Sequence, residues 1–255
     1  MAEWRSQAGL TKTALAEALG YTPQWISQVE AAKSIPSKEF AENLDTYFHT
    51  NGLFQRLWKR IIDTRYQAVL PPGFPEYQER EAEASQARIY QLTLVHGLLQ
   101  TEKYIRAVVG PKQDPDTADR LVAERLKRQQ ILTRENPPYV WFTLDEAALR
   151  REVAEREVMC EQLAHILSLE ERTNISIDVV PLSAGYYPGL AGSFTILGFT
   201  NAPDVVYGEL GGQGMLIQDP RIVAKFAVTY NSLRGDALRV AESRALITKV
   251  MEEYG

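Results

Sequence analysis

Residues 11–30 form the most strongly patterned segment of the chain. Apolar side chains recur at helical spacing on both sides of a three-residue break at 20–22, which predicts two short helices joined by a tight turn. Thr22 can cap the second helix, and Pro23 in its first position loses no needed hydrogen bond. Ala16 is small enough for the two helices to cross closely. These are the parts of a helix-turn-helix within a compact helical unit.

The second of these helices has a polar face. Gln24, Ser27 and Gln28 are separated by three and four positions, so their side chains point the same way. Short amide and hydroxyl groups on such a helix can reach base edges in the major groove of DNA, and Gln pairs naturally with adenine. The alternative is an ordinary helical hairpin whose polar face is merely solvated. The pattern favours the first interpretation, in which this helix face contacts DNA bases.

Turn and break residues divide the chain in two. Apolar positions at helical spacing, interrupted by stops rich in Gly, Pro and Asn, predict five helices within residues 1–68. The Pro-rich stretch 70–75 gives the clearest break that follows. We therefore expect a DNA-binding domain at 1–68, a linker at 69–75 and a larger domain at 76–255.

The larger domain mixes both kinds of secondary structure. Amphipathic patterns predict helices at 76–90, 114–134, 155–169, 219–234 and 237–253. β-Branched and aromatic runs between turn residues predict strands at 139–144, 175–180, 193–199 and 204–210. Because most of these strands follow one another closely, we expect an α+β domain with a small, mainly antiparallel sheet.

Residues 3–66 resemble the Xre and lambda-repressor-like family of DNA-binding domains. The resemblance rests on Gly-Leu-Thr, Leu-Ala, Gly and Ile-Ser-Gln-Val-Glu, in that order, within residues 9–30. It implies an all-α, five-helix fold in which the base-reading positions are Gln24, Ser27 and Gln28. Ala31 to Lys33 depart from the family pattern, which usually has Gly after the Glu.

The same resemblance assigns roles to residues around this face. Lys12 occupies a position where the family often has a Gln at the phosphate backbone, and Pro23 stands at the edge of the reading helix, next to the capping residue Thr22. All three are therefore candidate DNA contacts. Arg5 and Glu30 match a pair that forms an internal salt bridge in relatives, which implies a structural role for both residues.

Trp25 has two interpretations. It can pack against the turn between the two helices, or it can contact DNA, either by lying along a sugar-phosphate strand or by touching a thymine methyl group. Tryptophan is commonly partly buried with a polar edge left outside, which suits either environment. Trp25 is included among the candidate DNA contacts with both possibilities open.

The charge distribution limits how strongly the chain can hold DNA. The formal net charge is −5, whereas DNA-binding domains are usually basic. Residues 1–70 carry eight basic and seven acidic side chains, so most of the acidity lies in the second domain. Few phosphate contacts per subunit are then expected, which predicts a homodimer with modest, salt-sensitive affinity.

Several other classes of protein are disfavoured. Cys160 is alone, the first residues lack the apolar run of a signal peptide, and no segment is apolar for long enough to cross a membrane, so a cytoplasmic location is expected. The three His residues lie far apart, which predicts no metal site and no cofactor. Capping and solvation are sufficient to explain acidic residues such as Asp145 and Glu146, so no active site is expected.

Residues 75–252 resemble an actinobacterial domain of unknown function that follows Xre helix-turn-helices in WhiJ-like developmental regulators. The matching segments, in order, are 77–90, 94–104, 125–129, 144–150, 180–185 and 192–194. The resemblance implies a regulator often encoded beside a small partner protein, an arrangement likened to toxin and antitoxin pairs. It implies no particular ligand.

Together these features predict a transcriptional regulator that binds double-stranded DNA as a homodimer and is not an enzyme. Its second domain would sense a ligand or partner, dimerise, or do both. The alternative is an antitoxin-like interaction module that holds a small partner protein, with DNA binding serving only to regulate its own promoter. An enzyme with a DNA-binding head would need convergent polar residues in a pocket, which the sequence does not indicate.

Overall fold

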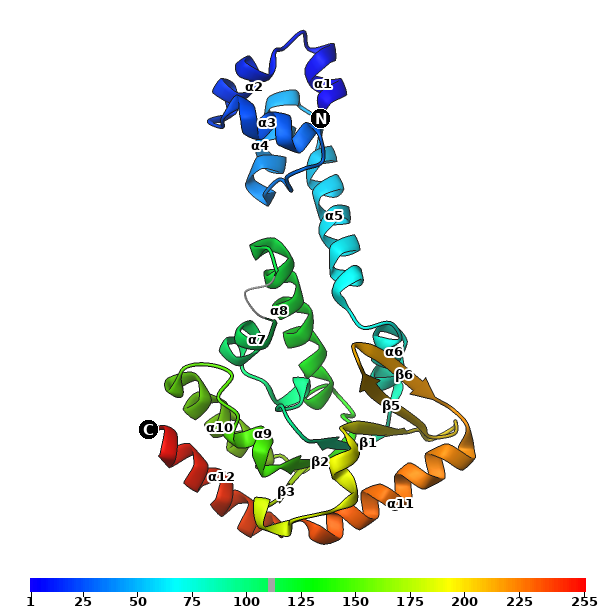
Figure 1. Ribbon diagram of the computed structural model, residues 1–255. Helices are drawn as coiled ribbons and strands as arrows, with labels where there is room; N and C mark the ends of the chain where they lie inside the picture. Colours follow the sequence, from blue (N-terminus) through cyan, green and yellow to red (C-terminus); the bar gives the residue numbers. More distant parts are fainter. Residues whose placement is uncertain (110–112) are drawn as a thin grey trace. The chain divides into compact units, whose positions relative to one another are not determined.

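The computed structural model describes residues 1–109 and 113–255 (Figure 1). These residues divide into two compact units, Met1–Ala68 and Val69–Gly255, and each unit has hydrophobic core residues of its own. No helix in the described stretches has the length and apolar character needed to cross a membrane.

The first unit is helical throughout. Its helices are α1 (Ala2–Gln7), α2 (Lys12–Leu19), α3 (Pro23–Glu30), α4 (Lys38–Phe48) and α5 (Leu53–Val69). Helices α2, α3 and α4 each begin at a hydroxyl residue that accepts a hydrogen bond from the backbone N–H three positions on, namely Thr11, Thr22 and Ser37. Ala16 and Ile26 are fully buried in the core, so α2 and α3 cross closely as the sequence predicts.

Asp45 organises the start of α5. Its carboxylate accepts hydrogen bonds from the backbone N–H of Phe54 at 2.8 Å and of Gln55 at 2.9 Å, and from the Thr50 hydroxyl. Burial by itself raises the pKa of Asp45, but these hydrogen bonds lower the pKa below its usual range. The carboxylate is therefore ionised at neutral pH, and its charge also interacts favourably with the helix N-terminus.

Ala32, two residues after the end of α3, has a left-handed backbone conformation with φ of +53°. A side chain in this conformation is strained, and the strain is absent in glycine. Ala32→Gly is therefore expected to raise the free energy of unfolding of the first unit by about 0.5 to 1 kcal/mol. Thermal unfolding measures this change, with Ala31→Gly as the control because Ala31 has φ of −85°. Equal effects of the two substitutions would contradict the prediction.

The second unit is α+β. Its longer helices are α6 (Phe74–Glu83), α7 (Glu102–Val109), α8 (Pro115–Gln129), α10 (Arg156–Glu170), α11 (Pro220–Asp236) and α12 (Val240–Tyr254). Shorter helical turns are η1 (Gly97–Leu99), η2 (Gln130–Leu132), α9 (Glu146–Arg150), η3 (Leu182–Ala184) and η4 (Pro188–Ala191). The strands are β1 (Gln86–Gln91), β2 (Tyr139–Asp145), β3 (Ile175–Val180), β4 (Phe194–Gly198), β5 (Val205–Leu210) and β6 (Gln213–Ile217).

These strands form one six-stranded sheet in the order β3-β2-β1-β4-β5-β6. Helices cover both of its faces: α10 and α12 pack together on one core, and α11 packs on the other (Figure 1). In β1, Ile89 belongs to the first core and its neighbour Tyr90 to the second. The sheet is therefore the middle layer of this unit.

The prediction of a mainly antiparallel sheet is confirmed only in part, because the sheet is mixed. β1 pairs with β2 and β2 pairs with β3 in parallel, whereas the pairings among β1, β4, β5 and β6 are antiparallel. The connections from β1 to β2 and from β2 to β3 both contain helices, which is the kind of crossover that parallel neighbours require. The sequence prediction gave too little weight to these helices.

The four predicted strands are confirmed as β2 to β5, but the number of helices differs from the prediction, and β1 and β6 were missed. The helix predicted at 76–90 ends at Glu83, and its last part is strand β1. Ala, Arg and Gln in β1 favour a helix when taken alone, but burial of Ile89 and Tyr90 on opposite faces stabilises the strand.

Candidate nucleic-acid interface

Helix α3 presents the polar face expected from the sequence. Burial of Ile26 fixes the rotation of the helix about its axis. Gln24 is exposed, and Ser27 and Gln28 are half-buried beside it. The structure thus places these three side chains on the face opposite the core contact, as their spacing requires.

Gln24 and Gln28 differ in how their side chains are held. The Ser34 hydroxyl donates a hydrogen bond to Gln28 Oε1 at 3.1 Å, which orients the amide and leaves its NH₂ group as a donor. Among the described residues, the side chain of Gln24 has no hydrogen-bond partner. Ser34 was not predicted as part of the site, because it lies outside the helix and only the loop after α3 brings it back to Gln28.

Two basic residues, Arg5 and Lys12, bind side chains of α3 beside this polar face. Arg5 Nε lies 2.6 Å from Glu30 Oε1, Arg5 Nη2 lies 3.1 Å from Glu30 Oε2, and Arg5 Nη1 donates to the Leu10 carbonyl at 2.7 Å. Lys12 Nζ donates to Ser27 Oγ at 3.0 Å and lies 3.7 Å from Glu30 Oε2. The hydrogen bonds from Arg5 lower the pKa of Glu30, so its carboxylate is ionised and joins α1, α2 and α3.

Lys12 and Ser27 are therefore already in contact with each other. The ammonium group of Lys12 is partly exposed, and an ammonium group has three donors, so it retains hydrogen-bonding capacity toward solvent. The ion pair of Arg5 with Glu30, which the family resemblance implies, lies mostly buried beneath the polar face.

Trp25 packs within the unit. Its ring stacks on Tyr21 with centroids 4.6 Å apart and meets the Phe40 ring edge to face at 4.4 Å. Thr22 and Pro23, the two other candidate contacts at the edge of α3, are both exposed. The packing of Trp25 secures the turn between α2 and α3, and Thr22 and Pro23 are left facing solvent.

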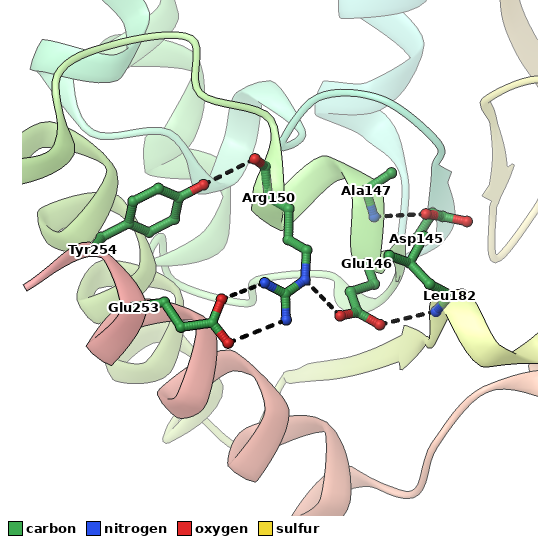
Figure 2. Close-up of polar contacts among 7 residues, drawn as sticks. All are labelled: Asp145, Glu146, Ala147, Arg150, Leu182, Glu253 and Tyr254. Atoms are coloured by element: carbon green, nitrogen blue, oxygen red, sulfur yellow. Dashed lines mark hydrogen bonds and ion pairs between the residues drawn. The ribbon is translucent and has the colours of Figure 1, made fainter.

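In the second unit, acidic residues at the end of β2 bind other parts of the same unit (Figure 2). Asp145 accepts a hydrogen bond at 2.7 Å from the backbone N–H two positions on, at the start of α9. Glu146 accepts from Arg150 Nε at 2.6 Å and from Leu182 N at 2.9 Å, and Arg150 also pairs with Glu253 of α12. These carboxylates therefore have structural partners and connect α9, α12 and the loop after β3.

A second buried network lies near the start of this unit. The guanidinium of Arg128 pairs with both carboxylate oxygens of Glu81, and the Tyr77 hydroxyl donates to Glu81 Oε1 at 2.6 Å. Burial by itself raises the pKa of Glu81, but the charge and hydrogen bonds of Arg128 lower the pKa below its usual range. Both partners of this ion pair are charged and largely hidden from solvent.

His96 is buried close to this network. Its Nδ1 accepts a hydrogen bond from Leu98 N at 3.3 Å, so the proton of the neutral ring lies on Nε2. Burial, together with the smaller effect of the charges of Arg128 and Arg125, lowers the pKa of His96 to about 3, while the charge of Glu81 opposes this shift. His96 is therefore neutral at physiological pH.

The lowered pKa of His96 predicts that the free energy of unfolding depends on pH in a measurable way. The unfolded chain binds a proton at His96 below about pH 6.5, while the folded chain stays neutral until about pH 3, so acid favours unfolding in between. The free energy of unfolding is expected to fall by up to about 1.4 kcal/mol per pH unit below pH 6 because of this group. Urea unfolding of wild type and His96→Asn between pH 7 and 5 tests this, and identical slopes would contradict it.

Within residues 1–109 and 113–255, no three or more His, Cys, Asp or Glu side chains gather in an arrangement that could hold a metal ion. Cys160 is half-buried and is not part of a disulfide. The structure thus brings together the predicted residues of the polar α3 face, and the network around Glu81 and His96 is an additional feature that sequence reasoning did not predict.

Comparison with family models gives two matches in sequence order. Residues 1–55 match a helix-turn-helix domain, and residues 74–249 match a domain of unknown function, DUF5753. No curated protein and no solved structure gives a significant match to the chain. The first match supports a DNA-binding regulator, and the second spans more than half of the chain. The chain therefore belongs to the DUF5753 family and carries a helix-turn-helix domain at its N-terminus.

Proposed function

We propose that this protein is a sequence-specific transcriptional regulator that reads double-stranded DNA through α3. The observation that carries the proposal is the pair of glutamines one turn apart on this helix. Gln24 is exposed and has no hydrogen-bond partner within residues 1–109 and 113–255, and Gln28 is oriented by Ser34. An amide group presented in this way matches the donor and acceptor edge of adenine in the major groove.

The proposed active form is a homodimer in the cytoplasm. The first seventy residues are nearly neutral overall, so one subunit supplies few phosphate contacts and a second subunit is needed for useful affinity. Two helix-turn-helices about 34 to 36 Å apart would then bind a roughly palindromic site. In this proposal the second unit dimerises, senses a ligand or partner, or does both, and it catalyses no reaction.

Fluorescence anisotropy tests the DNA-binding proposal. The purified full chain is titrated onto the DNA upstream of its own coding sequence and onto a scrambled duplex, over a series of salt concentrations. We expect a preference of about tenfold or more for its own DNA, since specific binders exceed their non-specific affinity by at least that ratio. The absence of any preference at every salt concentration would reject sequence-specific reading by this chain alone.

A second candidate function is an antitoxin-like interaction module that holds a small partner protein. The exposed apolar side chains of the second unit favour it: Leu182 in η3 is 58% exposed, Tyr186 between η3 and η4 is 89% exposed, and Val228 on α11 is 70% exposed. Helix α11 contacts η4, which begins two residues after Tyr186. The resemblance to WhiJ-like regulators supports such a partner, and binding without DNA preference would favour this second function.

A further inference from the structure

The second unit contains a cavity of about 490 Å³. Its walls come from the loop after β1, from η1 and α8, from the first turn of α6, and from β4 and β5. Pockets of about 300 to 1,000 Å³ hold small molecules in many proteins, and this volume lies within that range. All of the lining residues that the structure describes belong to the second unit.

Much of the lining is apolar and only half-buried. Phe74, Leu92 and Leu94 line the cavity, and each keeps part of its surface accessible. The Phe74 ring adjoins Tyr77, with centroids 5.8 Å apart, and Tyr77 stacks on Tyr207 at 4.1 Å. These rings hold one another in place and offer a flat apolar surface to a ligand ring. Covering that surface removes it from water, which favours an aromatic ligand.

The charged groups of the lining have partners in the protein or face solvent. Arg128 pairs with the buried carboxylate of Glu81. Arg125 donates to Gln100 Oε1 at 2.7 Å and is not a free charge either. Glu209 is exposed, so its carboxylate remains hydrated. A charged ligand would lose its hydration here without gaining a free partner of opposite charge, so the lining favours an uncharged one.

The lining also contains a buried hydrogen-bond donor that is unpaired. His96 is 8% exposed, and its Nδ1 accepts a hydrogen bond from Leu98 N at 3.3 Å, which leaves the proton of the neutral ring on Nε2. Within residues 1–109 and 113–255, Nε2 has no hydrogen-bond partner, yet it is not fully enclosed, so it is accessible from the cavity that His96 lines. An acceptor atom on a ligand would satisfy this donor, which the Leu98 contact holds in place.

We propose that this cavity binds a small uncharged aromatic molecule that carries a carbonyl oxygen. The carbonyl oxygen accepts a hydrogen bond from His96 Nε2, and the ring lies against Phe74. The proposal deepens the proposed regulatory function and rests on it for its biological meaning, because the ligand would be the signal that the second unit senses.

The position of Phe74 gives such a ligand a route to influence the rest of the chain. Phe74 is the first residue of α6, and only residues 70–73 separate it from the end of α5. This short loop is fastened to the sheet because Gly214 N of β6 donates to the Pro72 carbonyl at 2.9 Å. A ring bound against Phe74 would therefore stabilise the segment that follows the first unit.

The test uses the fluorescent ketone 6-propionyl-2-(dimethylamino)naphthalene, with 2-(dimethylamino)naphthalene as the same ring system without the carbonyl group. Both uncharged probes, and the anionic probe 8-anilinonaphthalene-1-sulfonate, are titrated onto the full chain without DNA. We expect saturable binding of the ketone, tighter than that of the anion and about fivefold or more tighter than that of the amine, because only the ketone can pair with the buried donor. Equal affinity for the ketone and the amine, or tighter binding of the anion, would overturn the proposal.

His96→Asn tests the hydrogen bond itself. The shorter amide can still accept from Leu98 N, but it offers no donor at the position of Nε2. Affinity for the ketone should fall about fivefold or more, while affinity for the amine stays unchanged. His96→Gln, whose longer amide reaches the position of Nε2, should recover most of the ketone affinity. Equal losses for both probes in His96→Asn would indicate damage to the cavity and would reject the assigned hydrogen bond.

Thr93→Trp tests the place of binding. Thr93 is an exposed residue of the lining, so a large side chain there takes up space that the ligand needs. Ketone affinity should fall about tenfold or more, as overpacking of a site does. Thr200→Trp makes the same substitution at an exposed position outside the lining and should have no effect. Unchanged binding in Thr93→Trp would locate the probe elsewhere and reject the cavity as its site.

The same samples are titrated onto DNA. Absence of ketone binding in a chain that prefers its own upstream DNA would reject the cavity proposal alone. Ketone binding that follows the expected pattern in a chain without any DNA preference would keep the ligand site and reject the regulatory function.

Discussion

Arg128→Met is expected to lower the free energy of unfolding of the second unit by about 3 to 5 kcal/mol. The guanidinium pairs with Glu81, whose side chain is only 3% exposed, and it lies 5.2 Å from the centre of the Phe74 ring. Methionine fills much of the same space but leaves a buried carboxylate without its charge partner. Hydrogen exchange of the slowest backbone amides in β1 and β2 measures the change in this unit separately from the first.

The double variant Arg128→Met with Glu81→Met is the informative control. Replacing both members of a buried ion pair by apolar side chains is often close to neutral, so we expect the double variant to recover most of the loss. A double variant as unstable as Arg128→Met alone would show that packing of the arginine, and not its pairing with Glu81, stabilises the unit.

Gln28→Ala is expected to cost about 1 to 3 kcal/mol in binding to the protein's own upstream DNA, a loss of roughly fivefold to 150-fold in affinity. Its affinity for scrambled DNA should stay unchanged, because a base contact contributes little on a duplex that lacks the matching base. Anisotropy titrations on both duplexes at one salt concentration measure the two losses.

Gln7→Ala removes the same side chain from an exposed position on α1 and serves as the matched control. Ser34→Ala is a second comparison, since it frees the Gln28 amide without removing it. An equal loss on specific and scrambled DNA would assign Gln28 to the phosphate backbone instead of a base.

Local sequence signals were sufficient for the DNA-binding unit. Thr22 and Pro23 mark the start of α3, and the burial of Ile26 follows from the spacing of apolar residues on one helix face. The hydrogen bond from Ser34 to Gln28 was not predictable in the same way, because it depends on the conformation of the loop that follows α3.

The second unit was harder to predict because its sheet depends on distant partners. The two glycines 211 and 212 have positive φ and join β5 to β6 in a tight hairpin, so the Gly-rich sequence there is a turn and not a phosphate-binding loop. Strand β1 had no comparable local signal. Its neighbours β2 and β4 come from residues 139–145 and 194–198, and burial between them outweighs its helical composition.

The cavity of about 490 Å³ in the second unit was equally unpredictable from local sequence signals. Phe74, His96, Arg125 and Tyr207 come from four separate segments, and no spacing rule connects them in the sequence. The neutral state of His96 and the proton on its Nε2 follow only from burial and from the hydrogen bond that Leu98 N donates to Nδ1.

The interior position of β1 also determines when each unit can fold during synthesis. The first unit contains only nearby helices and is complete at residue 68, whereas β1 lacks its second neighbour until residue 198 has left the ribosome. At about 5 to 20 residues per second, the interval after β1 is made lasts roughly 5 to 20 seconds. Throughout this interval the nascent chain carries a folded first unit and an unpaired strand edge, so chains that terminate early would be released with a folded helix-turn-helix and would be prone to aggregate.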